Sequence, residues 1–217
     1  MKRLGRGRLD LRRARPWARA AGVTGTAANV LLAAFYAVEV GRRRVLPVSL
    51  GSANDVVGSV GTGLMVPVVL AVSPSRWTRR LGLTATGVLT LAGPALVLGL
   101  VPFAVQMPIA IGAFQGLAGW IVLSSRGRRG TLPDQVTRLG VLSGGGVLAG
   151  GVVAVAGLLL PKGSLQRRAT LTVGGAPAAL GGLAIPIWFL QLGRALPTDG
   201  GATGASRSGD NAYVVGG

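Results

Sequence analysis

Residues 51–70 read Gly51-Ser-Ala-Asn-Asp-Val-Val-Gly-Ser-Val-Gly-Thr-Gly-Leu-Met-Val-Pro-Val-Val-Leu70, and they decide the fold class. An acid, Asp55, stands at the start of an apolar run that is long enough for a helix to cross a bilayer, which takes about 20 residues. Other apolar runs of this length contain no ionisable residue. The pattern predicts an all-α protein, a polytopic bundle of transmembrane helices.

Uncharged runs between basic segments predict six spans. Residues 81–125 carry no charge over 45 positions, and as one helix they would extend about 67 Å, roughly twice the hydrocarbon thickness. They therefore form two spans, with a turn at Gly99-Leu-Val-Pro102, where glycine and proline favour chain reversal. The predicted spans are about 20–40, 54–73, 81–98, 103–123, 139–160 and 171–192.

Two tails flank this transmembrane domain of residues 20–194. Residues 1–19 predict a basic cytoplasmic tail, and residues 195–217, rich in Gly, Ala and Ser, predict a disordered cytoplasmic tail. With six spans, 17 Lys and Arg fall on the side of the termini and six on the other side. The positive-inside rule therefore predicts that both termini are cytoplasmic. The arginines closest to the first span are predicted to contact anionic lipid, and they are Arg12, Arg13, Arg15 and Arg19.

Composition excludes several classes of function. Charged residues make up 13% of the chain and its mean hydropathy is +0.55, whereas about a quarter of residues are charged in soluble domains. The net charge of +17 comes from arginines in the gaps between apolar runs, so the expected partners are the lipid bilayer and its anionic headgroups, with no nucleic acid. The chain has no Cys and no His, which removes thiolate and imidazole chemistry. We expect no catalytic residue, no metal and no cofactor.

Asp55 has two interpretations. As an acid facing a cavity in the bundle, it could bind a cation or carry a proton. As the last residue of Ser52-Ala-Asn-Asp55, which has the S-x-x-D form of a capping box, it would reach back to the N–H of a capping Ser52. We favour the cap, because an aspartate at a helix N-terminus also meets the positive end of the helix dipole. Glu39 is predicted on the same outer side, paired with the arginines at 42–44 rather than with a metal.

Two carboxamides fall near mid-depth in the predicted spans. Asn29 lies at the middle of the first span and Gln115 near the middle of the fourth, so both are predicted to face the bundle interior. One role is hydrogen bonding between helices and the other is a polar lining for a substrate path, and we favour the first. No Asp, Glu, Lys or Arg lies near mid-depth, which argues against a proton relay of carboxylates.

Three stretches carry a resemblance to known proteins. They are Ser52-Ala-Asn-Asp-Val-Val-Gly58, then Trp120-Ile-Val-Leu-Ser-Ser-Arg126 with Leu132-Pro133 and Arg138-Leu-Gly, and Ile185-Pro-Ile-Trp-Phe-Leu-Gln-Leu-Gly-Arg194. In these stretches the chain resembles the small, uncharacterised six-span integral membrane proteins of high-GC Gram-positive bacteria. The resemblance implies a multi-pass protein of the bacterial plasma (inner) membrane, and it assigns no activity and no functional residue.

The sequence therefore predicts an integral membrane protein that is not an enzyme, and that moves a small neutral or apolar solute or serves as an accessory membrane subunit. The alternative is a structural or interaction module that packs through glycine-rich helix faces against a membrane-protein partner or a second copy of the chain. A third hypothesis is a lipid-modifying enzyme that uses Asp55 and Glu39 as its acids.

Overall fold

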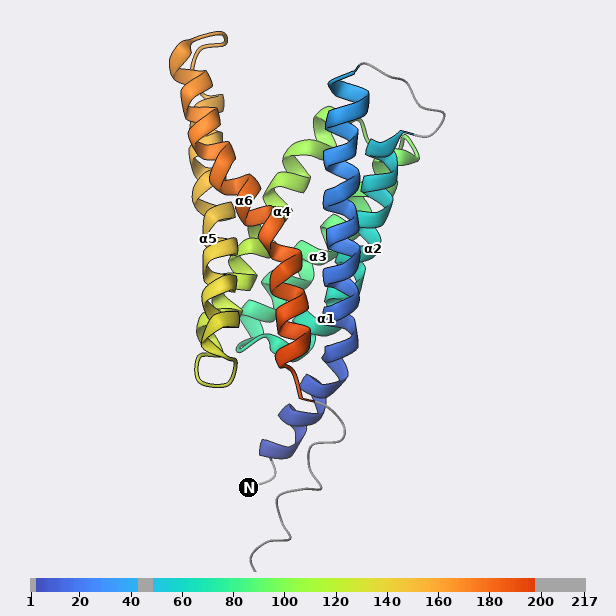
Figure 1. Ribbon diagram of the computed structural model, residues 1–217, viewed down its shortest axis with the longest axis vertical. Coiled ribbons are helices and arrows are strands. Elements are labelled where there is room, and N and C mark those ends of the chain that lie inside the picture. Colours follow the sequence, from blue (N-terminus) through green and yellow to red (C-terminus); the bar gives the residue numbers. More distant parts are fainter. Residues whose placement is uncertain (1–2, 43–48, 198–217) are drawn as a thin grey trace, which may run out of the picture.

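The computed structural model describes residues 3–42 and 49–197, and nearly all of them are helical (Figure 1). Six long helices and one short π-helical segment follow one another, with no strand within these ranges. The elements are α1 (Arg3–Ala34), η1 (Phe35–Val40), α2 (Leu50–Val72), α3 (Arg76–Val97), α4 (Phe103–Gly127), α5 (Asp134–Leu158) and α6 (Leu165–Ala195).

Each of the six helices is long and apolar enough to cross a membrane. The shortest, α3, has 22 residues and extends about 33 Å, which matches the roughly 30 Å of bilayer hydrocarbon. Large aliphatic side chains such as Leu91, Val152 and Leu180 are exposed on the outside of the bundle, as expected where lipid is the solvent. The predicted fold class, an all-α bundle of six spans, is confirmed, and the chain is a multi-pass integral membrane protein.

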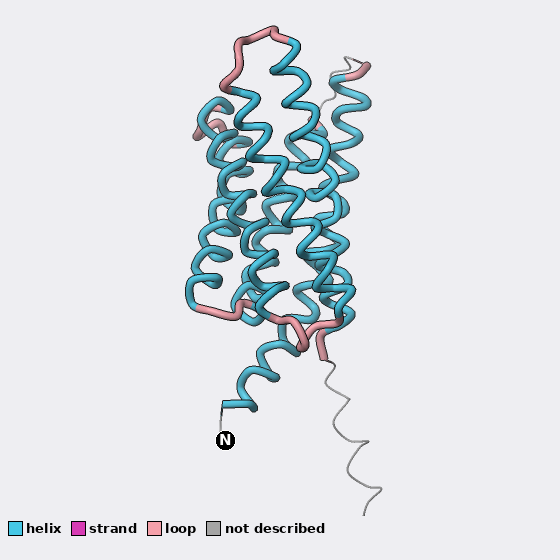
Figure 2. Tube along the Cα trace, turned by 90° about the vertical axis from the view of Figure 1, so that its left-hand side faces the viewer, coloured by secondary structure: helices cyan, strands magenta, loops and turns pink. Residues whose placement is uncertain are grey.

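The six helices form a closed ring. Each helix packs against the next one in the chain, and α6 completes the ring by packing against α1. Every connection reverses the chain direction, so the start of α1 and the end of α6 lie at the same end of the bundle (Figures 1 and 2). We call this end the termini end, and we call the opposite end, where η1 and the α5–α6 turn lie, the far end.

Several helices begin before the apolar runs that predict them. α3 begins at Arg76, α5 at Asp134 and α6 at Leu165, five or six residues ahead of the predicted spans. Hydropathy marks the part of a helix that lipid surrounds, whereas the helix itself continues to its cap. Ser75 caps α3 and Ser164 caps α6, and each Oγ accepts the backbone N–H three residues further on.

The first helix also extends past its predicted span. α1 begins at Arg3, so the basic segment predicted as a tail over 1–19 continues the first span without a break in the helix. Ala18 in this extension is buried in the same apolar cluster as Leu196, which follows α6. From residue 198 onward, the tail predicted over 195–217 lies outside the described residues.

The chain reverses between α3 and α4 at the Gly99–Pro102 stretch. Gly99 has a φ of +69°, a left-handed conformation in which the Cβ of any other L-residue would crowd the backbone. Pro102, with a φ of −62°, stands at the N-cap of α4, where the fixed φ of proline and its missing N–H are tolerated. Both residues suit a tight turn between two antiparallel spans.

The half of the ring toward the termini end is tightly packed around three aromatic rings. Trp120, Trp188 and Phe189 are fully buried there, and we call this cluster the aromatic plug. Trp188 stands edge-on to both neighbours, with ring centroids 5.9 Å from Trp120 and 4.9 Å from Phe189. The Trp120 indole N–H donates to Ser73 Oγ at 2.9 Å, and the Trp188 indole N–H donates to the Val136 carbonyl at 3.1 Å. The polar atoms of both indoles are therefore satisfied inside the bundle.

Small residues bring α5 and α6 to backbone contact. A Cβ on Gly150 would lie 2.5 Å from the backbone nitrogen of Ala178, and a Cβ on Gly174 would lie 2.6 Å from that of Ala154. No side chain fits between the helices at these points, so their close approach requires glycine. Toward the far end this pair stays together while it diverges from α1 and α4 (Figure 1).

Candidate functional site

The interior of the ring is hollow toward the far end. One chamber of about 640 Å³ is lined by residues of all six long helices and η1, and we call it the upper chamber. A second chamber of about 440 Å³ lies nearer the aromatic plug, and we call it the middle chamber. Leu32, Tyr36, Phe114 and Ala178 line both, so the chambers adjoin and form one axial cavity. Its size is that of small-molecule sites, which occupy about 300–1,000 Å³.

The wall of the upper chamber is mostly apolar, with a few polar groups. These groups are one acid, three carboxamides and one phenol, contributed by η1, α2 and α4: Asp55, Asn54, Gln106, Gln115 and Tyr36. An apolar wall with a few placed polar groups is typical of sites that bind and orient a small molecule.

Aromatic rings concentrate around the same chamber. Five Phe and Tyr side chains belong to the described residues, and four of them line it: Phe35, Tyr36, Phe103 and Phe114. Phe35 and Tyr36 stand edge to face, with centroids 5.3 Å apart. These residues therefore line the chamber from η1 and from α4, which are not neighbours in the ring of helices, and Tyr36 and Phe103 are each 59% exposed.

The N-cap of α2 is Ser49 rather than the predicted Ser52. The helix begins at Leu50, and Ser49 Oγ accepts a first-turn backbone N–H at 3.1 Å. Glu39 completes this cap, since its carboxylate accepts the Ser49 hydroxyl at 2.9 Å and also the backbone N–H of Leu50. A carboxylate from η1 thus takes the role that the S-x-x-D pattern gave to Asp55, and only the tertiary fold brings η1 to this helix end.

Asp55 lies one turn further into α2, on the stripe of that helix that faces the axial cavity. Positions 51, 54, 55, 58, 61, 62 and 65 line one chamber or the other, at the spacing of a single helix face. Among the described residues, Asp55 is the only charged side chain that lines either chamber. Its side chain is half-buried, so the geometry places a carboxylate in the wall of the cavity.

The two predicted carboxamides line different chambers. Gln115 borders the upper chamber, where its Nε2 donates to the Val147 carbonyl of α5 at 3.2 Å and lies against Gly151. Asn29 borders the middle chamber from α1 and is half-buried. Gln115 therefore links α4 to α5 as interhelical bonding requires, and both amides also lie in the cavity wall.

Sequence reasoning missed three polar side chains of the upper chamber. Asn54, Gln106 and Tyr36 lie near helix ends at the far end, where a polar residue is ordinarily assigned to the membrane interface. The position of Asn54 on the cavity stripe of α2 is a sequence signal that could have found it. Gln106 is likewise marked by its spacing, because positions 103, 106, 107, 110, 111, 114 and 115 of α4 line the same chamber, whereas no such spacing marks Tyr36.

Buried hydroxyls lie near the aromatic plug on α4 and α5. Ser124, Ser125 and Thr137 are nearly fully buried, and their hydroxyl oxygens have no hydrogen-bond partner within the described residues. Other hydroxyls of the bundle bond to the carbonyl four residues earlier, as Ser73 does to Val69 at 2.6 Å. Buried hydroxyls are ordinarily hydrogen-bonded, so we expect water, a ligand or a second conformation of the protein to supply partners for these three.

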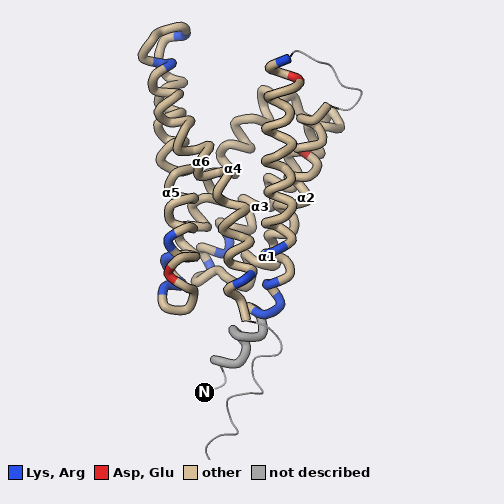
Figure 3. The backbone as a smooth tube through the Cα atoms, viewed as in Figure 1, with Lys and Arg blue, Asp and Glu red and all other residues tan. Residues whose placement is uncertain are grey.

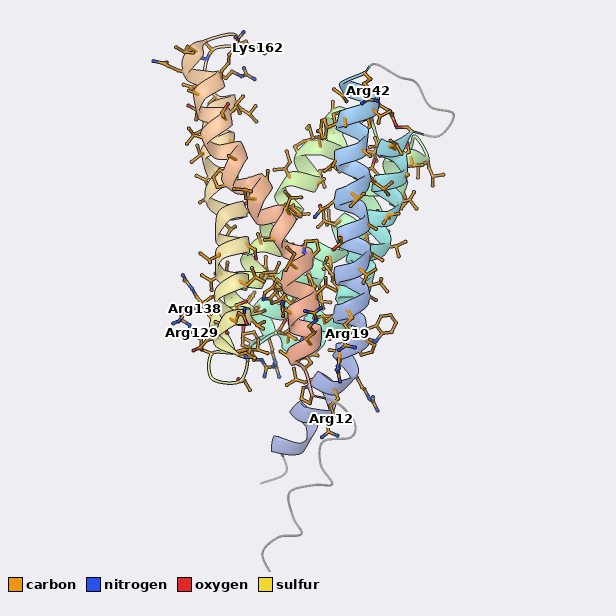
Figure 4. All side chains as sticks on the ribbon, in the orientation of Figure 1. Arg12, Arg19, Arg42, Arg129, Arg138 and Lys162 are labelled. Atoms are coloured by element: carbon orange, nitrogen blue, oxygen red, sulfur yellow. The ribbon has the colours of Figure 1, made fainter. Side chains whose placement is uncertain are left out.

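The arginines predicted to contact lipid lie on α1 toward the termini end (Figure 4). Arg13 and Arg19 are exposed, whereas Arg12 and Arg15 are half-buried. Arg15 Nε donates to the Gly193 carbonyl at 3.2 Å, so this side chain also joins α1 to the last turn of α6. Lipid contact stays a prediction for all four.

Charge is unevenly distributed between the two ends. Most of the described Lys and Arg gather at the termini end, while Arg42 and Lys162 mark the far end (Figures 3 and 4). No three His, Cys, Asp or Glu side chains of residues 3–42 and 49–197 lie close enough together to hold a metal ion. The wall of the upper chamber holds Asp55 and three carboxamides, and a separate pocket of about 510 Å³ at the termini end is lined by Arg129, Asp134 and Arg138.

Comparison of the chain with models of protein families, with curated proteins and with solved structures found no match. The resemblance to small six-span membrane proteins of high-GC Gram-positive bacteria stays a prediction.

Proposed function

We propose that this protein is a carrier in a bacterial plasma membrane, which binds a small and largely apolar solute in the axial cavity and moves it across the bilayer without chemical change. The observation that supports this most is the asymmetry of the ring, which is hollow toward the far end and filled by the aromatic plug toward the termini end. A bundle with no solute to bind would be more stable if side chains filled the cavity, because they would add dispersion contacts between the helices.

The unpartnered hydroxyls near the plug support passage to the other side. Ser124, Ser125 and Thr137 would gain water as a partner if the termini end opened while the far end closed. α5 and α6 are joined by backbone contacts and diverge from α1 and α4, so we expect them to move as one unit in such a change.

The two alternatives have less support. Part of the glycine-rich surface is used within the chain, since Gly150, Gly174 and Gly181 pack against backbone of α5 or α6, although a Cβ on other glycines, such as Gly112, would meet nothing within 4 Å. A lipid-modifying enzyme would need Glu39 and Asp55 as free acids, but the Glu39 carboxylate accepts two hydrogen bonds in the α2 cap. We therefore propose that the protein is not an enzyme.

Filling the upper chamber should abolish solute binding. Ala110 lines this chamber on α4, whereas Ala104 on the same helix is exposed and lines neither chamber. We expect Ala110→Trp to weaken the binding of triphenylphosphine oxide, a neutral aromatic probe, about tenfold or more, because the indole occupies the space that the probe needs. The measurement is thermal stabilisation of the purified protein by the probe, and Ala104→Trp is the matched control. Equal stabilisation of the two variants would argue against a solute site in this chamber.

Introduced cysteines can report both orientation and opening, because the chain has no native cysteine. Thr131 in the α4–α5 turn and Lys162 in the α5–α6 turn are exposed at opposite ends. From the distribution of basic residues, we expect Thr131→Cys to react with an impermeant thiol reagent only from the cytoplasm, and Lys162→Cys only from outside. The reverse pattern would overturn the orientation.

Ser125→Cys tests whether the closed end opens. Ser125 is fully buried near the plug, so its thiol is accessible only when that end admits water. We expect slow labelling of Ser125→Cys from the side that labels Thr131→Cys. Triphenylphosphine oxide should change this rate in Ser125→Cys and leave it unchanged when Ala110→Trp is added to the same protein. A thiol that never reacts from that side, with or without the probe, would make the protein a one-sided receptor instead of a carrier.

A further inference from the structure

We infer that the solute is a lipophilic organic cation, held in the upper chamber by the carboxylate of Asp55 and by the aromatic rings of the wall. This inference rests on the proposed function, since it names the class of solute for the same cavity. Three independent features of the chamber support it: the charge of its wall, its aromatic content and its lack of a metal-binding group of ligands.

Within residues 3–42 and 49–197, the charge of the wall is that of a single acid. Asp55 lines the upper chamber, and the basic side chains described at the far end, including Arg42 and Lys162, line neither chamber. Ionisable residues inside membrane spans are costly to maintain and commonly mark the path of an ion or a charged substrate. Glu39 lies at the same end of the bundle, but its oxygens are used in the cap of α2. Asp55 makes no such contact with the helix backbone, where Glu39 accepts the N–H of Leu50 and Ser49 accepts that of Gly51.

The aromatic rings favour the same sign of charge. Phe35, Tyr36, Phe103 and Phe114 line the chamber, and the face of an aromatic ring carries the negative part of its quadrupole. A cation within about 6 Å of such a face is attracted, more strongly where water is excluded. An anionic solute would meet both the carboxylate and these ring faces unfavourably.

A metal ion fits the chamber less well than an organic cation does. Calcium takes six to eight oxygen ligands and magnesium close to six, whereas the described wall offers one carboxylate and three carboxamides, without a cluster of three acids. An organic cation needs one counter-charge and a large apolar contact area. A chamber of about 640 Å³ with a mainly apolar wall provides both.

Three phenyl-substituted probes of different charge separate the outcomes, and the cation and the anion among them share the same tetrahedral shape. Tetraphenylphosphonium is a cation, triphenylphosphine oxide is neutral and tetraphenylborate is an anion. We expect the purified full-length protein to bind the phosphonium most tightly and the borate most weakly. Equal binding of all three would overturn the inference and leave the cavity as a site for apolar solutes. Failure of all three to bind the parent protein would instead overturn the proposed function.

Asp55→Asn tests the residue, because it keeps the shape of the side chain and removes its charge. We expect phosphonium binding to weaken about tenfold or more, since contacts with a charged partner are the stronger ones, while phosphine oxide binding stays within about twofold. Asp134→Asn is the matched control, because Asp134 is an exposed acid at the start of α5 that lines neither chamber. Asp55→Glu retains the charge and should restore much of the phosphonium preference, which separates loss of charge from loss of folding. Unchanged phosphonium affinity in Asp55→Asn would overturn the assignment of Asp55.

Discussion

Replacing Trp188 with alanine is expected to lower the free energy of unfolding by about 3–4 kcal/mol, within the range for large aromatic truncations in cores. In a bilayer the unfolded side chain would lie in lipid, so the loss comes from packing more than from hydrophobic transfer. Trp188 is fully buried between Trp120 and Phe189, and the Val136 carbonyl would lose its donor. The measurement is equilibrium unfolding in mixed micelles of mild and denaturing detergent.

Trp77→Ala is the matched control for this prediction. Trp77 is 77% exposed at the start of α3. The Arg80 guanidinium carbon lies over its ring, 5.2 Å from the ring centroid. Its truncation should cost about 0.5 kcal/mol or less, as is usual for surface substitutions. Similar losses at Trp77 and Trp188 would mean that the plug is not the packed centre of the termini end. The cavity would then lack the closed floor that the carrier hypothesis requires.

Gly150→Ala is expected to lower the free energy of unfolding by about 1–3 kcal/mol, the usual range for overpacking, although alanine is the better helix former. A Cβ there would lie 2.5 Å from the backbone nitrogen and 2.9 Å from the Cβ of Ala178, and against the Gly174 carbonyl. These atoms belong to the α6 backbone and its first side-chain carbon, so no rotamer change relieves the contact and the two helices must separate.

Gly145→Ala provides the opposite expectation on the same helix. A Cβ at Gly145 meets nothing within 4 Å, so only the gain in helix propensity remains. Stability should be unchanged or rise by up to about 1 kcal/mol. The difference in sign between two glycines five residues apart is the result to look for in the same unfolding experiment. If both variants gained stability, α5 and α6 would not be in backbone contact, and their movement as one unit would lose its basis.

The candidate site is partly predictable from the sequence, because a carboxamide at mid-depth in a span has to find polar partners inside the bundle. Asn29 and Gln115 were expected in the bundle interior from their depth alone, and both line the axial cavity. The spacing of Ser52 and Asp55 predicts a capping box, and this prediction is wrong because Ser49 and Glu39, which form the cap, meet only through the fold. The free N–H groups of a helix N-terminus donate to any acceptor that the fold places beside them. Spacing along the chain does not show which acceptor that is.

The sequence by itself determined that this is a bundle of six membrane helices, because an uncharged segment of about 20 residues satisfies its backbone in lipid only by coiling into a helix that crosses the bilayer. It also determined which groups were available to a site, through the absence of His and Cys and the scarcity of acids. Only the tertiary structure decided that the helices close into a ring, that the ring is filled at one end and hollow at the other, and that Asp55 lines the hollow part. The reason is that helix formation depends on each segment alone, whereas packing depends on which faces of distant segments fit one another.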